Sequence, residues 1–298
     1  MWTPFNQAAR PAHINEETPT AGGPAADVAR LERLMAMISV ADTGRELAAF
    51  LRDRGIEVRF LDALPQGGDT VGACVLKMSS IEEASPYRVA LDKPVINLLR
   101  GASDDRAAMA LLHEGRHAMQ AESGLHPLTR YLSREDTKSY IRMVEADAGS
   151  FTILTALKIF LTNGDDGVIK SAIRTQADDE CVAKIVNLVS EHGRDIVSDP
   201  VAQRALFDAW FSDKPQVARY DRYSDASWAE IHAAVQGSLG EAPVPSPLKR
   251  EDFLGLGTLT HADNYLTVPG MPDVAVACGL GGAKPPVVRA PPRGPGQG

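Results

Sequence analysis

The stretch of sequence that decides the fold is AAMALLHEGRHAMQA, residues 107–121. It is rich in Ala, Leu and Met, which favour the α-helix. Ser103 is a suitable N-cap for such a helix, and Asp104 and Asp105 place negative charge in its first turn, where the helix dipole favours it. We therefore predict a helix in which the polar pentapeptide His113–His117 lies near the middle.

Two histidines and a glutamate stand together in this pentapeptide. Successive residues of a helix are rotated by about 100°, so His113 and His117 project from the same face and can bind one metal ion. Glu114 lies beside them, offset from the line of the two imidazoles, which suits a general base that acts on a metal-activated water. These polar side chains are costly to bury on an apolar helix unless something pairs with them. The pattern therefore predicts a metal site.

A catalytic zinc ion normally has three protein ligands, and Glu145 is the best candidate for the third. Residues 133–162 are predicted to form one long helix, which begins at the cap Ser133. Glu145 falls on the edge of the apolar stripe of this helix, where a carboxylate needs a partner. Small neighbours let this helix approach the first one closely: Ala146, Ala148, Gly149 and Ser150.

Two further acidic residues are candidates for the third ligand. Asp147 ranks second: it points about 200° away from Glu145 on the helix and replaces it if the helix faces the other way. Glu180 lies in the acidic run 178–180, which is more typical of a solvated helix start.

His126, nine positions after His117, is also a candidate. The HExxHxxGxxH pattern requires a glycine and a histidine at the positions that hold Gln120 and Ser123. The sequence therefore disfavours that pattern.

These residues resemble the gluzincin branch of the zincin metallopeptidases, because HEGRH is followed 28 positions later by Glu145 within Glu-Ala-Asp-Ala. The resemblance covers about residues 56–160, and the chain looks most like uncharacterised bacterial metallopeptidase domains. It implies that His113, His117 and Glu145 bind zinc, that Glu114 is the general base and that peptide bonds are hydrolysed. The chain departs from better-known gluzincins four positions after Glu145, where it has glycine and not the aspartate of a Glu-x-x-x-Asp pattern.

The region before the motif is predicted to contain two helices and then several strands. The helices are expected at 26–40 and 43–54, and the strands at 56–61, 71–77, 87–91 and 95–98. This order predicts an α+β, zincin-like fold, in which a small N-terminal β-sheet packs on the active-site helix and a mostly helical half follows. The edge strand of such a sheet can receive an extended peptide by β-augmentation.

Beyond Gly164 the chain is predicted to be mostly helical and to form one wall of a cleft. The expected helices are 167–175, 178–192, 201–211 and 225–235. Four residues of this half are candidates for stabilising an oxyanion, and the sequence does not choose between them: Arg219, Tyr220, Tyr223 and His232.

Length and composition are those of one enzyme-sized domain, with 298 residues of which 44% are hydrophobic. We predict a disordered N-terminal segment at 1–24, a metallopeptidase domain at 25–262 and a flexible Pro/Gly-rich tail at 263–298. The net charge is −8 and the sequence has no Lys/Arg cluster, so we expect no nucleic-acid partner and no membrane partner.

The first residues do not form a basic segment followed by an apolar one, and no run of about 18 apolar residues occurs. The three cysteines are widely spaced and odd in number, which favours reduced thiols: Cys74, Cys181 and Cys278. We therefore expect a cytoplasmic protein, with non-classical export still open.

The sequence as a whole predicts a zinc-dependent peptidase that acts on a peptide or protein substrate, with Glu114 as general base. Zinc is expected as the metal, because imidazole is a poor match for the harder magnesium and calcium ions. Three different functions remain open: a metal-binding sensor or regulatory domain without peptidase activity, a different metal-dependent hydrolase, and a metal-free helical interaction protein. The sequence indicates neither the substrate nor the oligomeric state.

Overall fold

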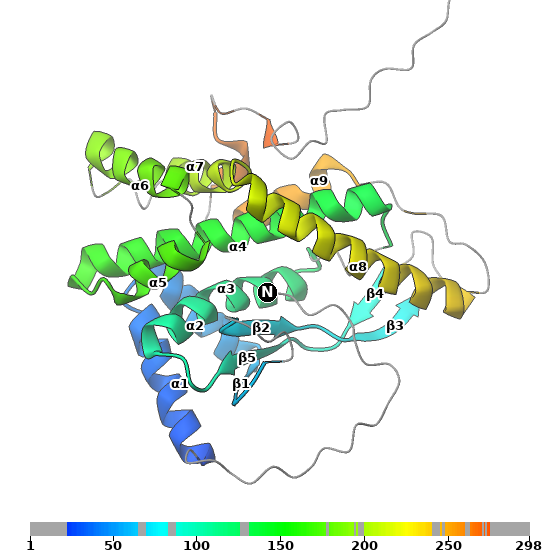
Figure 1. The fold of residues 1–298 in the computed structure, drawn as a ribbon, viewed down its shortest axis with the longest axis horizontal. Helices are drawn as coiled ribbons and strands as arrows, with labels where there is room; N and C mark the ends of the chain where they lie inside the picture. The colour runs from blue at the N-terminus through cyan, green and yellow to red at the C-terminus, as the bar shows by residue number, and fades with distance from the viewer. Residues whose placement is uncertain are drawn as a thin grey trace, which may run out of the picture.

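The computed structural model describes residues 23–64, 70–82, 88–125, 131–176, 179–193, 195, 200–239, 245, 248–259, 263–269, 271 and 273–274. A small β-sheet forms one layer, helix α3 (Asp104–Glu122) lies on it, and the long helix α4 (Arg134–Asn163) packs on α3 (Figure 1). The fold class is α+β, as the sequence predicts.

The sheet under α3 has three strands in the order β1 (Glu57–Leu61), β5 (Val95–Leu99) and β2 (Gly72–Val75). β1 pairs with β5 in parallel, whereas β2 pairs with β5 antiparallel. β2 is therefore an edge strand of this sheet, and it packs against α3. A separate antiparallel pair is formed by β3 (Met78–Glu82) and β4 (Arg88–Leu91).

Two helices precede the sheet, α1 (Pro24–Ile38) and α2 (Asp42–Asp53), and both pack on α3. The contact between α2 and α3 explains the glycine inside the HEGRH pentapeptide. A Cβ atom at Gly115 would lie 2.9 Å from both δ-carbons of Leu47, which is too close for any larger residue without a shift. Gly115 therefore serves the packing of α2.

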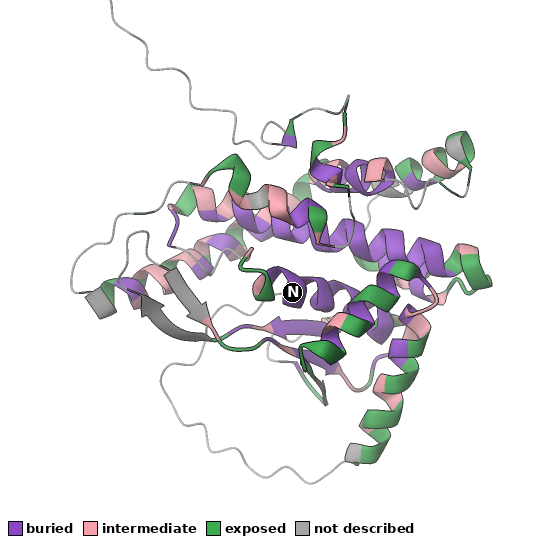
Figure 2. Ribbon diagram, turned by 180° about the vertical axis from the view of Figure 1, so that it is seen from behind, coloured by how far each residue is buried: buried purple, intermediate pink, exposed green. Residues whose placement is uncertain are grey.

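The two central helices begin and end where their capping residues predict. Ser103 accepts a hydrogen bond from the backbone N–H of Arg106 at the start of α3, and Ser133 accepts one from Asp136 at the start of α4. α4 ends at Gly164, whose φ of 79° is in the left-handed region that favours glycine. Both helices are buried along most of their length (Figure 2), so a polar side chain on either one must find a partner inside the protein.

The C-terminal half packs around α4, and its first helix also packs on α3. Its elements are α5 (Gly167–Gln176), α6 (Asp179–His192), α7 (Pro200–Trp210), α8 (Lys214–Leu239), α9 (Arg250–Leu254) and the short 3₁₀ turns η3 (Gly255–Thr258) and η4 (Tyr265–Thr267). α5, α7 and α8 pack on α4. Arg142 of α4 donates two hydrogen bonds of 2.6 Å to the carboxylate of Asp221, which fixes α8 on α4.

Two predicted elements differ from the structure by more than the shifts of one or two residues found elsewhere. The strand expected at 71–77 ends at Val75, and a further strand, β3, follows it. The helix expected at 225–235 is longer, since α8 already begins at Lys214. The helices expected at 167–175, 178–192 and 201–211 agree with α5, α6 and α7 to within one residue at each end.

The packed part of the chain extends past residue 263, where the sequence predicts a flexible tail. Tyr265 and Leu266 are buried and pack in one cluster with Phe207. Residues of the segment that the sequence predicts as a tail are therefore packed against the rest of the chain. The remaining predicted disorder, at 1–22 and 275–298, lies outside the described residues. Among the described helices, none combines the length and the apolar character that a bilayer crossing requires.

Candidate metal centre

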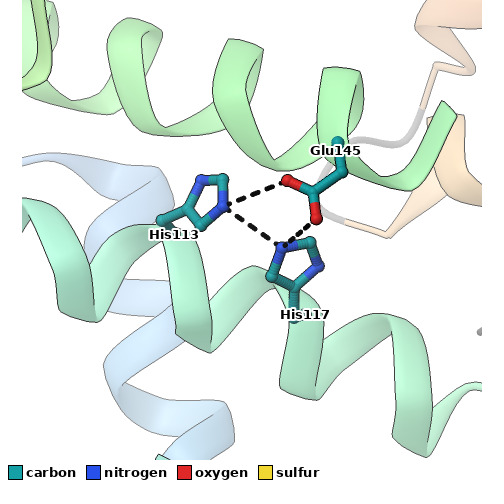
Figure 3. A group of neighbouring side chains, drawn as sticks. All are labelled: His113, His117 and Glu145. Atoms are coloured by element: carbon teal, nitrogen blue, oxygen red, sulfur yellow. Dashed lines mark hydrogen bonds and ion pairs between the residues drawn. The ribbon is translucent and has the colours of Figure 1, made fainter. Parts of the chain in front are cut away.

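α3 and α4 bring three potential metal ligands together (Figure 3). The Nε2 atoms of His113 and His117 are 3.2 Å apart. Glu145 faces them from α4, with Oε2 at 3.5 Å from His113 Nε2 and Oε1 at 3.6 Å from His117 Nε2. All three side chains are buried. Within the part of the chain that the structure describes, this is the one such group of metal-binding side chains.

The separations match those of ligands around a small tetrahedral ion. With bonds of about 2.0 to 2.1 Å, the ligand atoms of a tetrahedral zinc site lie about 3.3 to 3.4 Å from one another. Both oxygens of Glu145 are buried and have no hydrogen-bond partner among the described residues, and the same is true of His113 Nδ1. A buried carboxylate without a partner is strongly unfavourable, so the donor set fits a cation.

The protonation of the three side chains depends on this arrangement. Burial lowers the pKa of His113. Burial acts in the same direction at His117, but the negative charge of Glu145 outweighs it and raises the pKa of His117. At Glu145 burial opposes ionisation, yet the two imidazoles hold the pKa of its carboxyl well below the ordinary value. Glu145 is therefore charged, and a metal ion held here would compete with a proton on His117.

Gln120, one turn after His117, orients the imidazole of that histidine. The Gln120 amide nitrogen donates to the carbonyl of Val144 at 3.0 Å and to Asp147 Oδ2 at 2.8 Å. Its Oε1 is therefore turned to His117 Nδ1, 2.7 Å away. Because an amide oxygen only accepts, Nδ1 carries a proton, and Nε2 is the atom that faces the metal position.

Asp147 anchors this arrangement from the same helix as Glu145. It is completely buried and accepts two hydrogen bonds from Arg116, at 2.7 and 2.8 Å. It also accepts one of 2.7 Å from the hydroxyl of Tyr265. Asp147, the second-ranked candidate for the third ligand, therefore lies outside the metal group and binds the side chain that orients His117.

Glu114 is not part of the metal group but lies next to it. Its Oε2 accepts a hydrogen bond of 2.8 Å from the backbone N–H of Cys74, on the edge strand β2. β2 comes this close because residue 72 is glycine: a Cβ there would lie 2.9 Å from Glu114 Cγ. The Cys74 thiol is free and buried, and burial, followed by the charge of Glu114, raises its pKa well above the ordinary value. It is therefore neutral.

A cavity of about 490 Å³ opens beside the metal group. His113, Glu114 and Gly72 line it on one side, and Tyr220 of α8 lines it on the other. This volume lies in the range of sites for small molecules and short peptide segments. Burial, and after it the charge of Glu145, raise the pKa of Tyr220 well above the ordinary value, so its hydroxyl stays protonated beside the site.

The structure distinguishes the four oxyanion candidates that the sequence leaves open. Tyr220 and Arg219 both line the cavity. Burial, and after it the charge of Glu145, raise the pKa of Tyr223, but Tyr223 is not among the described residues that line the cavity. His232 instead shares a 2.5 Å hydrogen bond with Tyr131 and stacks on Trp228.

The structure does not describe the side chains of His126 and Glu180, the remaining candidates for the third ligand. His126 lies outside the described residues. Glu180 is in α6, which packs on α7, but the structure describes only its backbone. The residue that sequence reasoning missed is Gln120, although its spacing of three from His117 places both on one helix face.

Fold and site together define an α+β protein with a buried group of side chains that can hold a metal ion. The model of a family described as "Putative metallopeptidase family (DUF6782)" matches residues 70–266, and the chain belongs to this family. The match includes β2, both helices of the metal group and Tyr265. No curated protein and no solved structure matches the chain.

Proposed function

We propose that this chain is a zinc metallopeptidase of the gluzincin kind, with a zincin-like fold and with Glu114 as general base. The observation that carries the proposal is the group of His113, His117 and Glu145, whose ligand atoms are 3.2 to 3.6 Å apart around a carboxylate with no hydrogen-bond partner among the described residues. The chain order also supports it: a small sheet, then the histidine helix, then the glutamate helix.

Two imidazoles and one carboxylate favour zinc over magnesium or calcium, which prefer oxygen ligands. When bound, a zinc ion polarises the scissile carbonyl and acidifies the attacking water. The three residues leave room for a further ligand, because the cavity reaches His113.

Glu114 is proposed to carry a proton from the attacking water to the leaving amine. It lines the cavity next to His113 but is not in the metal group. The Cys74 N–H fixes one of its oxygens, and so limits the rotation of the carboxylate. A base held in this way takes a proton from water and delivers it to the amine as the peptide bond breaks.

Tyr220 is the best placed oxyanion donor. Its protonated hydroxyl lies at the cavity wall near Glu145, and the ion pair of Arg142 with Asp221 fixes the adjacent position on α8. A donor that is held in place before the reaction stabilises the developing negative charge without reorganisation.

The edge strand β2 offers a place for the substrate backbone. The backbone N–H of Leu99 donates to Val71, so residues 71, 73 and 75 of this antiparallel pair face β5. Gly72 therefore directs its N–H and carbonyl away from β5, and it lines the cavity. An extended peptide can add to the sheet at this position.

The test combines metal analysis with one substitution. Wild-type protein should contain about one zinc ion per chain, and His113→Ala or His117→Ala should remove it. Glu114→Gln should keep the zinc and the fold but lower peptide hydrolysis about a hundredfold or more. Glu122→Gln, an exposed glutamate at the end of the same helix, is the matched control and should keep full activity.

Each outcome has a distinct meaning. If wild-type protein stays metal-free after zinc addition, the metal centre is refuted. If zinc binds but no peptide in a diverse library is cleaved, the protein is a metal-binding domain without peptidase activity. If Glu114→Gln cleaves peptides as fast as wild type, Glu114 is not the base.

A further inference from the structure

Three arginines from three different helices line the cavity beside the metal group: Arg106 of α3, Arg174 of α5 and Arg219 of α8. All three are exposed to solvent. Among the described residues that line the cavity, Glu114 is the one with a carboxylate. The described lining therefore has more positive than negative side chains, in a chain whose net charge is −8. We call these three residues the arginine rim.

Two of the rim arginines, Arg174 and Arg219, differ from the arginines that fix α8 on α4. Arg142 and Arg134 of α4 are paired with Asp221 and Asp225 of α8. Arg174, in contrast, makes no ion pair or hydrogen bond with another described residue, and it is exposed where it lines the cavity. The guanidinium carbon of Arg219 lies 5.1 Å from the centre of the Tyr220 ring, which is a cation–π contact.

We propose, on the basis of the proposed peptidase function, that the arginine rim selects substrates with a carboxylate close to the cleaved bond. A guanidinium binds a carboxylate through two parallel hydrogen bonds, which gives both affinity and geometry. A positive lining within a negative molecule also steers acidic peptides toward the site and repels basic ones. The selected group is the side chain of Asp or Glu, or the C-terminal carboxylate of a peptide.

The distance of the rim from the metal group limits where this carboxylate lies in the substrate. Arg106 precedes His113 by seven residues on α3, which is a rise of about 10 Å along the helix. An extended peptide advances about 3.3 Å per residue. The selected carboxylate is therefore within about three residues of the cleaved bond.

The experiment uses zinc-loaded full-length protein and a series of fluorogenic peptides. The peptides differ only in the three positions on either side of the cleaved bond, which carry acidic, amide or lysine side chains, and each is made with a free and an amidated C-terminus. Acidic peptides should exceed the amide series by about tenfold in kcat/KM, and lysine peptides should be the poorest. Preference for the free C-terminus alone would identify the terminal carboxylate as the selected group.

Arg174→Glu is the test substitution, because Arg174 is not part of the metal group, whereas Arg219 lies over the ring of Tyr220. It should lower kcat/KM for acidic peptides about tenfold and improve cleavage of lysine peptides. Arg52→Glu is the matched control: it makes the same charge change on exposed Arg52 of α2, which does not line the cavity, and should leave the preference intact. Zinc content and thermal stability should be unchanged in both variants.

A binding measurement separates this inference from the proposed function. Zinc-loaded Glu114→Gln should bind labelled acidic peptides more tightly than amide or lysine peptides in fluorescence anisotropy, and adding Arg174→Glu should remove the difference. If wild type cleaves peptides but shows no acidic preference, or if Arg174→Glu behaves like Arg52→Glu, the rim proposal is overturned and the peptidase function stands. If nothing is cleaved and yet the binding order holds, the proposed function fails and the rim proposal stands.

Discussion

Replacement of Asp147 by asparagine tests whether Asp147 supports the metal group without being a ligand, in contrast to Glu145. Asp147 is completely buried and pairs with Arg116, which is also completely buried. It accepts further hydrogen bonds from Gln120 and Tyr265. Asparagine has nearly the same shape but no charge, and its amide nitrogen cannot accept, so Arg116 loses its paired carboxylate inside the protein.

The expected loss is large because both charges are out of contact with water. Removal of one partner of a buried ion pair costs about 3 to 5 kcal/mol, since it leaves an uncompensated charge. A domain has a free energy of unfolding of about 5 to 15 kcal/mol, so Asp147→Asn should fold but be clearly destabilised. The effect on zinc is indirect, through the orientation of Gln120 and His117. A change in such a supporting hydrogen bond lowers metal affinity about 10- to 100-fold.

Urea unfolding of the metal-free protein and zinc titration of the folded protein measure the two effects separately. Asp147→Asn should lower the free energy of unfolding strongly and zinc affinity moderately. Glu145→Gln should do the opposite, because it removes a ligand and also relieves a buried carboxylate that has no hydrogen-bond partner among the described residues. A destabilisation of less than about 1 kcal/mol in Asp147→Asn would refute the anchor role. If Asp147→Asn loses all zinc and Glu145→Gln retains it, then Asp147 and not Glu145 is the ligand that α4 supplies.

Two further predictions concern His117. Gln120→Leu should keep the fold but lower zinc affinity about 10- to 100-fold, measured by competition with a zinc chelator, because the His117 ring loses its orienting acceptor; an unchanged affinity would show that Gln120 does not orient the ligand. Zinc affinity should fall between about pH 8 and about pH 5.5, because the raised pKa of His117 lets a proton compete with the metal above the ordinary value of 6.5. The stability of the metal-free protein should change in the opposite direction with pH. Because the pKa of His117 is raised, this residue stabilises the fold fully below pH 6.5, and the contribution is lost as the pH rises through the folded-state pKa of His117. A zinc affinity that does not change over this range would contradict the predicted proton competition.

The fold could be predicted where local signals determine an element. Ser103, Ser133 and Gly164 are capping residues, and they place the ends of α3 and α4 within one residue of the prediction. The start of α8 is locally ambiguous. Pro215 fits the first turn of a helix, but proline is also common in loops, and the apolar periodicity that predicts the helix begins only later in the sequence. β3 is not predictable in this way because its partner is β4, and strand pairing depends on tertiary contacts more than on intrinsic preference.

In the candidate site too, residues placed by local helix spacing could be predicted, whereas contacts between distant segments could not. His113, Glu114 and His117 share one helix, and the facing of Glu145 follows from the apolar stripe of another, so these four residues are accessible to sequence reasoning. Gln120 is accessible too, since its spacing of three from His117 places a hydrogen-bonding amide beside an imidazole. In the sequence, however, Gln120 counts only as the residue that stands where the HExxHxxGxxH pattern requires glycine. Its hydrogen bond with His117 is therefore not predicted.

The contact of Asp147 with Tyr265 is of a different kind, because it joins residues 118 positions apart. No periodicity or cap relates the two segments, and residue 265 lies in the segment 263–298 that the sequence predicts as a flexible tail. Asp147 already binds Arg116 and Gln120, and the hydroxyl of Tyr265 gives its buried carboxylate a further donor. The segment around Tyr265 therefore supports the metal group through a contact that only the tertiary structure reveals.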